Sequence, residues 1–267
     1  MSVESTKKII GVALGVCIVC SILVSSAAVA LKSRQEENKK LEKIKNILIA
    51  GDLLKEGKGI EKTYNQYIEA AIIDLESGQP LPEEKYTDDL NTKNFDVKSI
   101  ASNPNYNRRI PPAKDLAGIK IMPKYMAVYY VKQNDEISKI IIPVYGKGLW
   151  STMYGFMALD KDLRTIEGFT FYEHGETPGL GGEVDNPRWK SIWKGKKAFD
   201  ENWDVRITVI KGVVDPSSDQ AKYEVDGLSG STLTTRGVDH LVKFWLGDEG
   251  YGPFFERLRG ESSDGQI

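Results

Sequence analysis

An apolar segment near the N-terminus sets the first part of the chain apart from the rest. Residues 9–31 form a run of 23 residues that contains no charged side chain. As a helix, this run would be about 34 Å long, enough to cross a hydrocarbon layer of about 30 Å. The apolar core of a cleaved signal peptide is shorter, usually about 7–15 residues. The length therefore favours a retained membrane helix, and the sequence predicts an N-terminal membrane anchor over residues 1–35.

Helical spacing of apolar residues continues beyond this anchor. Leu41, Ile44 and Leu48 share one helix face within a charge-dense stretch, which predicts a helix over 36–58 that ends at its glycines. A second set of apolar positions fits the i, i+4, i+7, i+8 spacing of an amphipathic helix. Its members are Ile60, Tyr64, Tyr67, Ile68, Ala71, Ile72 and Leu75. The sequence therefore predicts two helices in series before an irregular stretch over 78–112 that is rich in Pro, Asn, Asp and Lys.

The pattern changes to that of strands from residue 125 onward. β-Branched and aromatic runs are separated by turn residues, which is typical of consecutive strands in an antiparallel sheet. The predicted strands are Met126–Val131, Ile137–Tyr145, Ser151–Leu159, Arg164–Tyr172 and Val205–Lys211. A last amphipathic helix is predicted over 234–246. We therefore expect an α+β fold: a single transmembrane helix, a helical and irregular membrane-proximal region over 36–115, and a domain over 116–267 with a mainly antiparallel sheet and flanking helices.

Charge refines this division. The chain has 36 basic and 38 acidic residues, a formal net charge of −2 that does not indicate a nucleic-acid-binding protein. Residues 1–35 carry a net +3, so the remaining 232 carry −5. Lys and Arg are more frequent after the apolar run than before it, which by the positive-inside rule favours a cytoplasmic body. Long domains can cross the membrane regardless of flanking charge, so the charge pattern leaves the side of the membrane open.

Both cysteines of the chain, Cys17 and Cys20, lie inside the apolar run. At lipid depth a cysteine behaves as a small apolar residue, and we favour this interpretation. The alternative is half of a metal site that a partner helix completes. The body has no cysteine, which excludes disulfides and any iron–sulfur cluster held there by cysteines of this chain alone.

Common catalytic motifs are absent from the sequence. The only two histidines, His174 and His240, are far apart and are most simply structural. No phosphate-binding P-loop, Rossmann glycine fingerprint or Gly-x-Ser-x-Gly elbow is present. We therefore expect neither a catalytic acid–base group nor a metal site.

Two glycine-rich segments remain as candidate ligand sites. The first, over 174–182, has four glycines directly after a predicted strand, so that its backbone can approach a ligand closely and Leu180 can cover a flat ring. The second, over 226–235, is rich in hydroxyl residues and precedes the last helix. Such residues are usually helix caps, although a helix start is also suited to binding phosphate.

The second segment resembles the family of flavin-binding domains in which FMN is attached covalently through a phosphoester to a threonine. The acceptor motif of that family, Asp-x-x-Ser/Thr-Gly-Ala/Ser-Thr, is matched by Asp226, Ser229, Gly230, Ser231 and Thr232. By position in the motif, the resemblance makes Thr232 the flavin acceptor. Ser231 is a mild departure, because Ala is more common there in the family.

Further blocks resemble the family of the C subunit of sodium-translocating NADH:quinone reductases. These blocks are Tyr145–Trp150, His174–Gly182, Val184–Trp189 and Gly250–Phe254. The resemblance covers nearly the whole chain, including the membrane helix. The related G subunit of Rnf electron-transport complexes shares both flavin loops but is shorter, and it is the closest alternative. A membrane-anchored binding or sensory module without flavin is the alternative from a different class.

The resemblance to the reductase family implies an electron-transfer role inside a membrane complex. The expected partners are membrane subunits that bear iron, a second flavin subunit, and a flavin transferase that attaches FMN from FAD outside the cytoplasmic membrane. The soluble domain is then expected on the periplasmic side of the bacterial inner membrane. The residues expected to line the flavin pocket, besides the acceptor motif, are Gly148, Trp150, Glu176, Thr177, Gly179 and Leu180.

Overall fold

The computed structural model describes residues 6–54, 59–134 and 136–263, and its contacts divide the chain into two compact units, Met1–Lys43 and Ile44–Ile267. The described part of the first unit lies within helix α1 (Thr6–Ala50), whose 45 residues include the apolar run. The side chains of that run are exposed, and α1 is long and apolar enough to cross a membrane. The predicted anchor and the predicted helix after it are thus one continuous helix.

Helix α1 ends earlier than the sequence indicated. After Ala50 the backbone of Asp52 adopts a left-handed conformation, with φ of 58°, and the amide of Leu53 donates to the carbonyl of Leu48 at 2.8 Å. This local closure ends the helix before Gly57 and Gly59 are reached. Gly57 lies outside the described residues, and Gly59 precedes α2 (Ile60–Tyr67).

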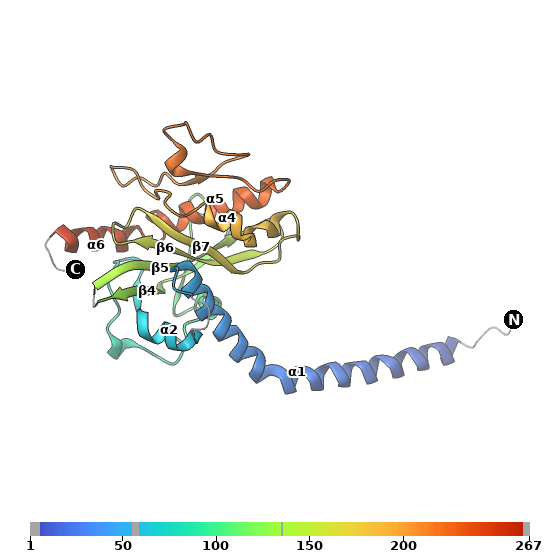
Figure 1. Ribbon diagram of the computed structural model, residues 1–267. Helices are drawn as coiled ribbons and strands as arrows, with labels where there is room; N and C mark the ends of the chain where they lie inside the picture. Colours follow the sequence, from blue (N-terminus) through green and yellow to red (C-terminus); the bar gives the residue numbers. More distant parts are fainter. Residues whose placement is uncertain (1–5, 55–58, 135, 264–267) are drawn as a thin grey trace. The chain divides into compact units, whose positions relative to one another are not determined.

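A five-stranded antiparallel sheet forms the centre of the second unit, in the order β1-β4-β5-β6-β7. Its strands are β1 (Ile68–Asp74), β4 (Tyr125–Gln133), β5 (Glu136–Lys147), β6 (Thr152–Asp160) and β7 (Ile166–Glu173). Strands β4 to β7 follow one another as a meander, which confirms the four strands and the antiparallel arrangement predicted there. In Figure 1, α4 (Pro187–Ser191) and α5 (Thr232–Leu246) lie on one face of this sheet and α2 lies on the other.

The predicted helix over 60–75 is wrong in its second half. The helix stops at Tyr67, and β1 begins at the next residue and pairs along its whole length with β4, from Ile68↔Val131 to Asp74↔Tyr125. The isoleucines of this stretch suit a helix face and a strand equally well. Pairing with β4 decided the outcome, because it satisfies the backbone of β1 and buries Ile72 and Ile73.

Two other predictions need correction. The stretch predicted as irregular contains η1 (Glu83–Lys85), α3 (Val97–Ser102) and β2 (Asn107–Arg109), which pairs with β3 (Ile121–Pro123). The predicted strand over 205–211 shrinks to β8 (Thr208–Val209), paired in parallel with β9 (Glu224–Val225). A side chain replaces a backbone partner there: the carboxylate of Asp239 accepts from the amide of Val209 at 2.9 Å.

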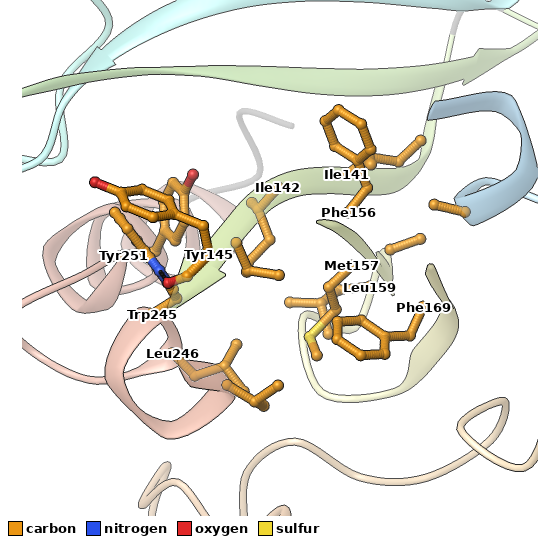
Figure 2. Packing of buried hydrophobic residues seen from close by; sticks show 14 of the residues in the cluster. Ile141, Ile142, Tyr145, Phe156, Met157, Leu159, Phe169, Trp245, Leu246 and Tyr251 are labelled. Atoms are coloured by element: carbon orange, nitrogen blue, oxygen red, sulfur yellow. Dashed lines mark hydrogen bonds between the residues drawn. The ribbon is translucent and has the colours of Figure 1, made fainter. Parts of the chain in front are cut away.

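Helix α5 packs closely on β5, and this contact positions the candidate site. A Cβ on Gly146 would lie 2.5 Å from Cβ of Leu241, and one on Gly237 would lie 2.4 Å from the carbonyl oxygen of Lys147. Without side chains at these two positions, the helix can lie directly on the strand. Figure 2 shows Trp245 of α5 beside Tyr145 of β5, where the indole Nε1 donates to the Tyr145 carbonyl at 2.6 Å.

The core extends from this contact through the sheet. Its buried side chains include Ile141, Ile142, Phe156, Met157 and Phe169 from three neighbouring strands (Figure 2). Helix α6 (Gly252–Ser263) follows α5 and adds Phe254 and Phe255, both buried. The fold thus holds the start of α5 against the end of β5 by a close-packed apolar layer.

Candidate functional site

Three segments that are distant in sequence meet at the start of α5, and the carboxylate of Glu176 joins them. Oε1 accepts from the amide of Trp150 at 3.0 Å and from that of Ser151 at 3.3 Å. Oε2 accepts from the amide of Leu149 at 3.3 Å and from the hydroxyl of Thr234 at 2.6 Å. The turn after β5, the glycine loop after β7 and the first turn of α5 therefore form one hydrogen-bonded cluster.

The environment of Glu176 keeps its carboxyl ionised. The residue is 5% exposed, and this desolvation by itself raises the pKa. The hydrogen bonds from Thr234 and from the three backbone amides lower the pKa by more, so that it lies below its ordinary value. At neutral pH the cluster is therefore built around a buried negative charge.

Two glycines make room for this carboxylate. A Cβ on Gly148 would lie 2.5 Å from Oε1 of Glu176, and a Cβ on Gly181 would lie 2.5 Å from Oγ1 of Thr234. Any side chain at either position would push the cluster apart. The structure thus gives Gly148, which the sequence assigned to the flavin pocket, a packing role beside Glu176.

The threonines of the 226–235 segment differ sharply in exposure. Thr234 and Thr235 are 1% and 5% exposed, and both hydroxyls are hydrogen-bonded, to Glu176 and to the amide of Leu228 respectively. Thr232 is exposed. Of the three threonines in this segment, Thr232 is therefore the one whose hydroxyl is accessible to a reagent or an enzyme.

Thr232 is also the first residue of α5, which makes its surroundings favourable for an anion. The preceding Ser231 caps no amide of this helix with its side chain, and the first turn contains no acidic residue. Gly230, with φ of 71°, forms the turn that leads into the helix. The amides of a helix start stabilise a nearby negative charge by about 0.3–1 kcal/mol when exposed.

Large apolar side chains are exposed on the segments that meet at the start of α5. Leu149, Trp150, Leu180 and Leu233 are 46%, 69%, 45% and 53% exposed. Leu180 extends to the 226–235 segment, because a Cβ on Gly230 would lie 3.2 Å from its Cδ2. A helix start that favours a negative charge, together with exposed apolar side chains, suits a ligand with one phosphate and a flat apolar ring.

The remaining predicted residues lie around this centre. Thr177 and Gly179 are at the exposed tip of the glycine loop, where the Thr177 carbonyl accepts from the amide of Leu180 at 3.1 Å. Asp226 connects the 226–235 segment to two neighbouring parts of the chain. Its carboxylate accepts from the amide of Val214 at 2.8 Å, and its carbonyl accepts from Nε1 of Trp189 at 2.8 Å. Ser229 is exposed on the turn.

Sequence reasoning missed several supporting residues. Nδ1 of His174 accepts from the amide of Glu176 at 3.2 Å, and its Nε2 donates to Asp185 at 2.7 Å. Asp185 also pairs with Lys190 at 3.1 Å. Burial raises the pKa of Asp185, but its bonds to His174 and Lys190 outweigh this and lower it. The sequence signal for this network was weak, because only the place of His174 at the start of the 174–182 segment indicated it.

The comparisons with known proteins agree with this geometry. Residues 148–247 match the FMN-binding domain family, and this range contains the whole cluster around Glu176 and Thr232. The class of the protein is therefore an FMN-binding domain carried on an apolar N-terminal helix, and the predicted cofactor class is confirmed.

Relatives over the full length specify the family. The chain is 45% identical to the C subunit of the Na(+)-translocating NADH-quinone reductase of Pseudomonas aeruginosa, over 96% of its own length and 97% of the relative. It is 43% identical to the same subunit of Vibrio parahaemolyticus over 96% of both chains. The crystal structure of Shewanella oneidensis NqrC matches 84% of this chain and 99% of that one, with a TM-score of 0.75 and 35% identity.

This chain belongs to the family of the C subunit of the Na(+)-translocating NADH-quinone reductase. The family is that of a membrane oxidoreductase complex, which confirms the predicted class of enzyme and the α+β fold with one N-terminal membrane helix. The Rnf alternative and the flavin-free module are both disfavoured, because full-length relatives are named for the reductase and the FMN-binding domain matches.

Proposed function

We propose that the chain carries FMN covalently on Thr232 and relays electrons between redox centres of the reductase complex. The observation that carries the proposal is the exposure of Thr232 at the start of α5, beside two threonines whose hydroxyls are buried and hydrogen-bonded. The motif resemblance points to the same residue independently of the geometry.

The attachment is a phosphoester exchange that a separate flavin transferase performs. The Thr232 oxygen forms a bond to the FMN phosphorus of FAD, the pyrophosphate bond breaks, and AMP leaves. The hydroxyl proton passes to a base of the transferase or to water. The product keeps one negative charge, which the amides at the start of α5 stabilise.

The exposed apolar side chains around Thr232 are the proposed contacts of the flavin ring. Trp150 and Leu180 approach from the two other segments of the cluster, and Leu149 and Leu233 flank them. Thr177 and Gly179 lie at the loop tip, where they border the same surface. Bound FMN supplies the electron-transfer chemistry, and the protein positions it and adjusts its surroundings.

The same proposal covers the partners and the topology. The electron donors and acceptors are membrane subunits that bear iron and a second flavin subunit. Because the transferase acts outside the cytoplasmic membrane, the soluble part is periplasmic. We further propose that residues 1–35 anchor the chain, that 36–115 form the membrane-proximal region, and that 116–267 form the FMN-binding part.

Flavin fluorescence in a denaturing gel tests the acceptor. The chain produced together with its transferase should give a fluorescent band, and its intact mass should include one FMN. Thr232→Val should remove both signals, whereas Ser191→Ala, at an exposed serine outside the motif, should retain them. A fluorescent Thr232→Val band would show that another residue carries the flavin.

A further inference from the structure

We propose that the Glu176–Thr234 hydrogen bond is a positioning device that presents the Thr232 hydroxyl for flavin attachment. This inference rests on the proposed function. It assigns to Glu176 a role through Thr234 and the neighbouring backbone, in place of direct contact with the cofactor, and it adds Thr234 to the residues that the site needs.

The coordination of Glu176 is complete without a ligand. An ionised carboxylate offers about four acceptor positions, and four protein donors occupy those of Glu176: three backbone amides and the Thr234 hydroxyl. Gly148 and Gly181 pack directly against this cluster. The side chain is thus used within the protein, and its effect on the cofactor is exerted through the groups that it holds.

Helix geometry transmits the position of Thr234 to Thr232. Each residue of an α-helix is rotated by about 100° from the one before it. Residues i and i+2 therefore differ by about 200° and point to nearly opposite sides of the helix axis. When Thr234 is directed inward to the carboxylate, Thr232 is necessarily directed outward. The packing of α5 on β5 sets the rotation of the helix, and the bond holds the first turn in that rotation, with Thr232 exposed.

The usual device for fixing a helix start is missing here. Ser231 makes no side-chain cap bond to this helix, and the described contacts of the first turn run through Thr234 and Thr235. The bond from Thr234 is charge-assisted and the residue is 1% exposed, so water cannot readily replace it. Loss of this bond should leave the acceptor turn poorly ordered.

The same carboxylate also fixes the turn that carries Trp150. Its bonds to the amides of Leu149 and Trp150 place these exposed side chains relative to Thr232. One charge thus aligns the point of attachment with the proposed contacts of the ring. Both flavin loading and the environment of the bound flavin should depend on it.

The test measures flavin loading of the full chain in detergent, purified without its transferase and then incubated with the transferase and FAD. Thr234→Val should slow the initial rate of flavin incorporation by about tenfold or more, since it removes a bond to a charged group. Thr234→Ser keeps the hydroxyl and should load within about twofold of the wild-type rate.

Thr208→Val is the matched control, because it also removes a hydrogen bond from a threonine to a carboxylate, here one that joins β8 to α5. The Thr208 hydroxyl donates to Asp239 of α5 at 2.7 Å, two turns beyond the acceptor. This variant should load like the wild type. As a second readout, the visible circular dichroism of flavin in Thr234→Val made by long incubation should differ from that of the wild type, whereas Thr208→Val should match it.

The outcomes separate the two proposals. Loading of Thr234→Val at the wild-type rate, slow loading of Thr234→Ser, or equal slowing by Thr208→Val would each overturn the positioning role. If the wild-type chain takes up no flavin, or takes it up when Thr232 is replaced by Val, the assignment of the acceptor is wrong and the positioning role fails with it.

Discussion

The geometry of the site depends most on Glu176, through its buried carboxylate. It accepts from backbone amides of one segment and from the Thr234 hydroxyl of another, and its own amide donates to His174. Because these bonds favour the ionised form, the pKa of Glu176 is lowered. A carboxyl group with a lowered pKa in the folded state stabilises that state above its unfolded pKa and ceases to do so as the pH falls through the folded value.

This linkage gives a pH-dependent prediction for Glu176→Gln. The amide group cannot accept from all four donors, so the variant should be less stable than the wild type by about 1–3 kcal/mol at pH 7. The difference should shrink as the pH falls below about 4, near the unfolded pKa of a glutamate, because the wild-type carboxyl becomes protonated. Thermal unfolding of both chains between pH 7 and pH 3 measures it, and a constant difference across this range would contradict the prediction.

At the scale of elements, close backbone approaches replace side-chain packing at two junctions. Helix α5 reaches β5 through Gly146 and Gly237, and the end of α1 reaches β7 through Gly168. At the second junction, a Cβ on Gly168 would lie 2.2 Å from the carbonyl oxygen of Ala50. The end of α1 is thus part of the sheet's packing and contributes Ile47 and Leu48 to the core.

Gly168→Ala should therefore destabilise the second unit. The added methyl group meets backbone atoms that cannot rotate away, and overpacking of this kind typically costs about 1–3 kcal/mol. The midpoint of thermal unfolding should fall by several degrees. Gly260→Ala is the control: nothing lies within 4 Å of its added Cβ in α6, so this change should be neutral or stabilising by up to about 1 kcal/mol. Equal effects of the two substitutions would argue against the α1–β7 contact.

At the scale of the whole molecule, the apolar run and the body require different surroundings. In the apolar run of α1 the large side chains are exposed, whereas the last residues of α1 are buried in the second unit. A membrane satisfies the first condition and the core satisfies the second. The proposed boundary after residue 35 lies between the two, and the contacts of the structure divide the chain after Lys43.

Removal of residues 1–35 should give a chain that stays in solution without detergent. The truncated chain keeps the buried Asn46, Ile47, Leu48 and Ala50 at the end of α1. Truncation before Asp52 should be strongly destabilising, since it deletes these residues, and loss of each large apolar side chain costs about 2–5 kcal/mol. Size-exclusion chromatography and thermal unfolding compare the two truncations. Precipitation of the longer chain would show that the boundary is misplaced.

The periplasmic orientation predicts where a new thiol can be labelled. Val213 is 81% exposed, and the body contains no cysteine. In a chain with Cys17 and Cys20 replaced by Ser, Val213→Cys should react with a membrane-impermeant maleimide when only the outer membrane is permeabilised. Labelling that requires disruption of the inner membrane would place the body in the cytoplasm.

The sequence was sufficient where local pattern and burial agree. Strands β4 to β7 have contiguous β-branched and aromatic runs, and the 23-residue apolar run is longer than the usual apolar core of a signal peptide. Helix α5 was predicted to within two residues at its start. The motif with Thr232 was also visible, because its residues are contiguous in the sequence.

Tertiary structure decided what the local pattern left ambiguous. The isoleucines of β1 fit a helix and a strand equally, and only pairing with β4 selected the strand. The bond between Glu176 and Thr234 joins positions 58 residues apart, so no spacing rule could indicate it. A sequence determines which groups are available and how each segment can fold by itself. Which donor meets a buried carboxylate depends on the packing of α5 against β5, and that contact exists only in the folded chain.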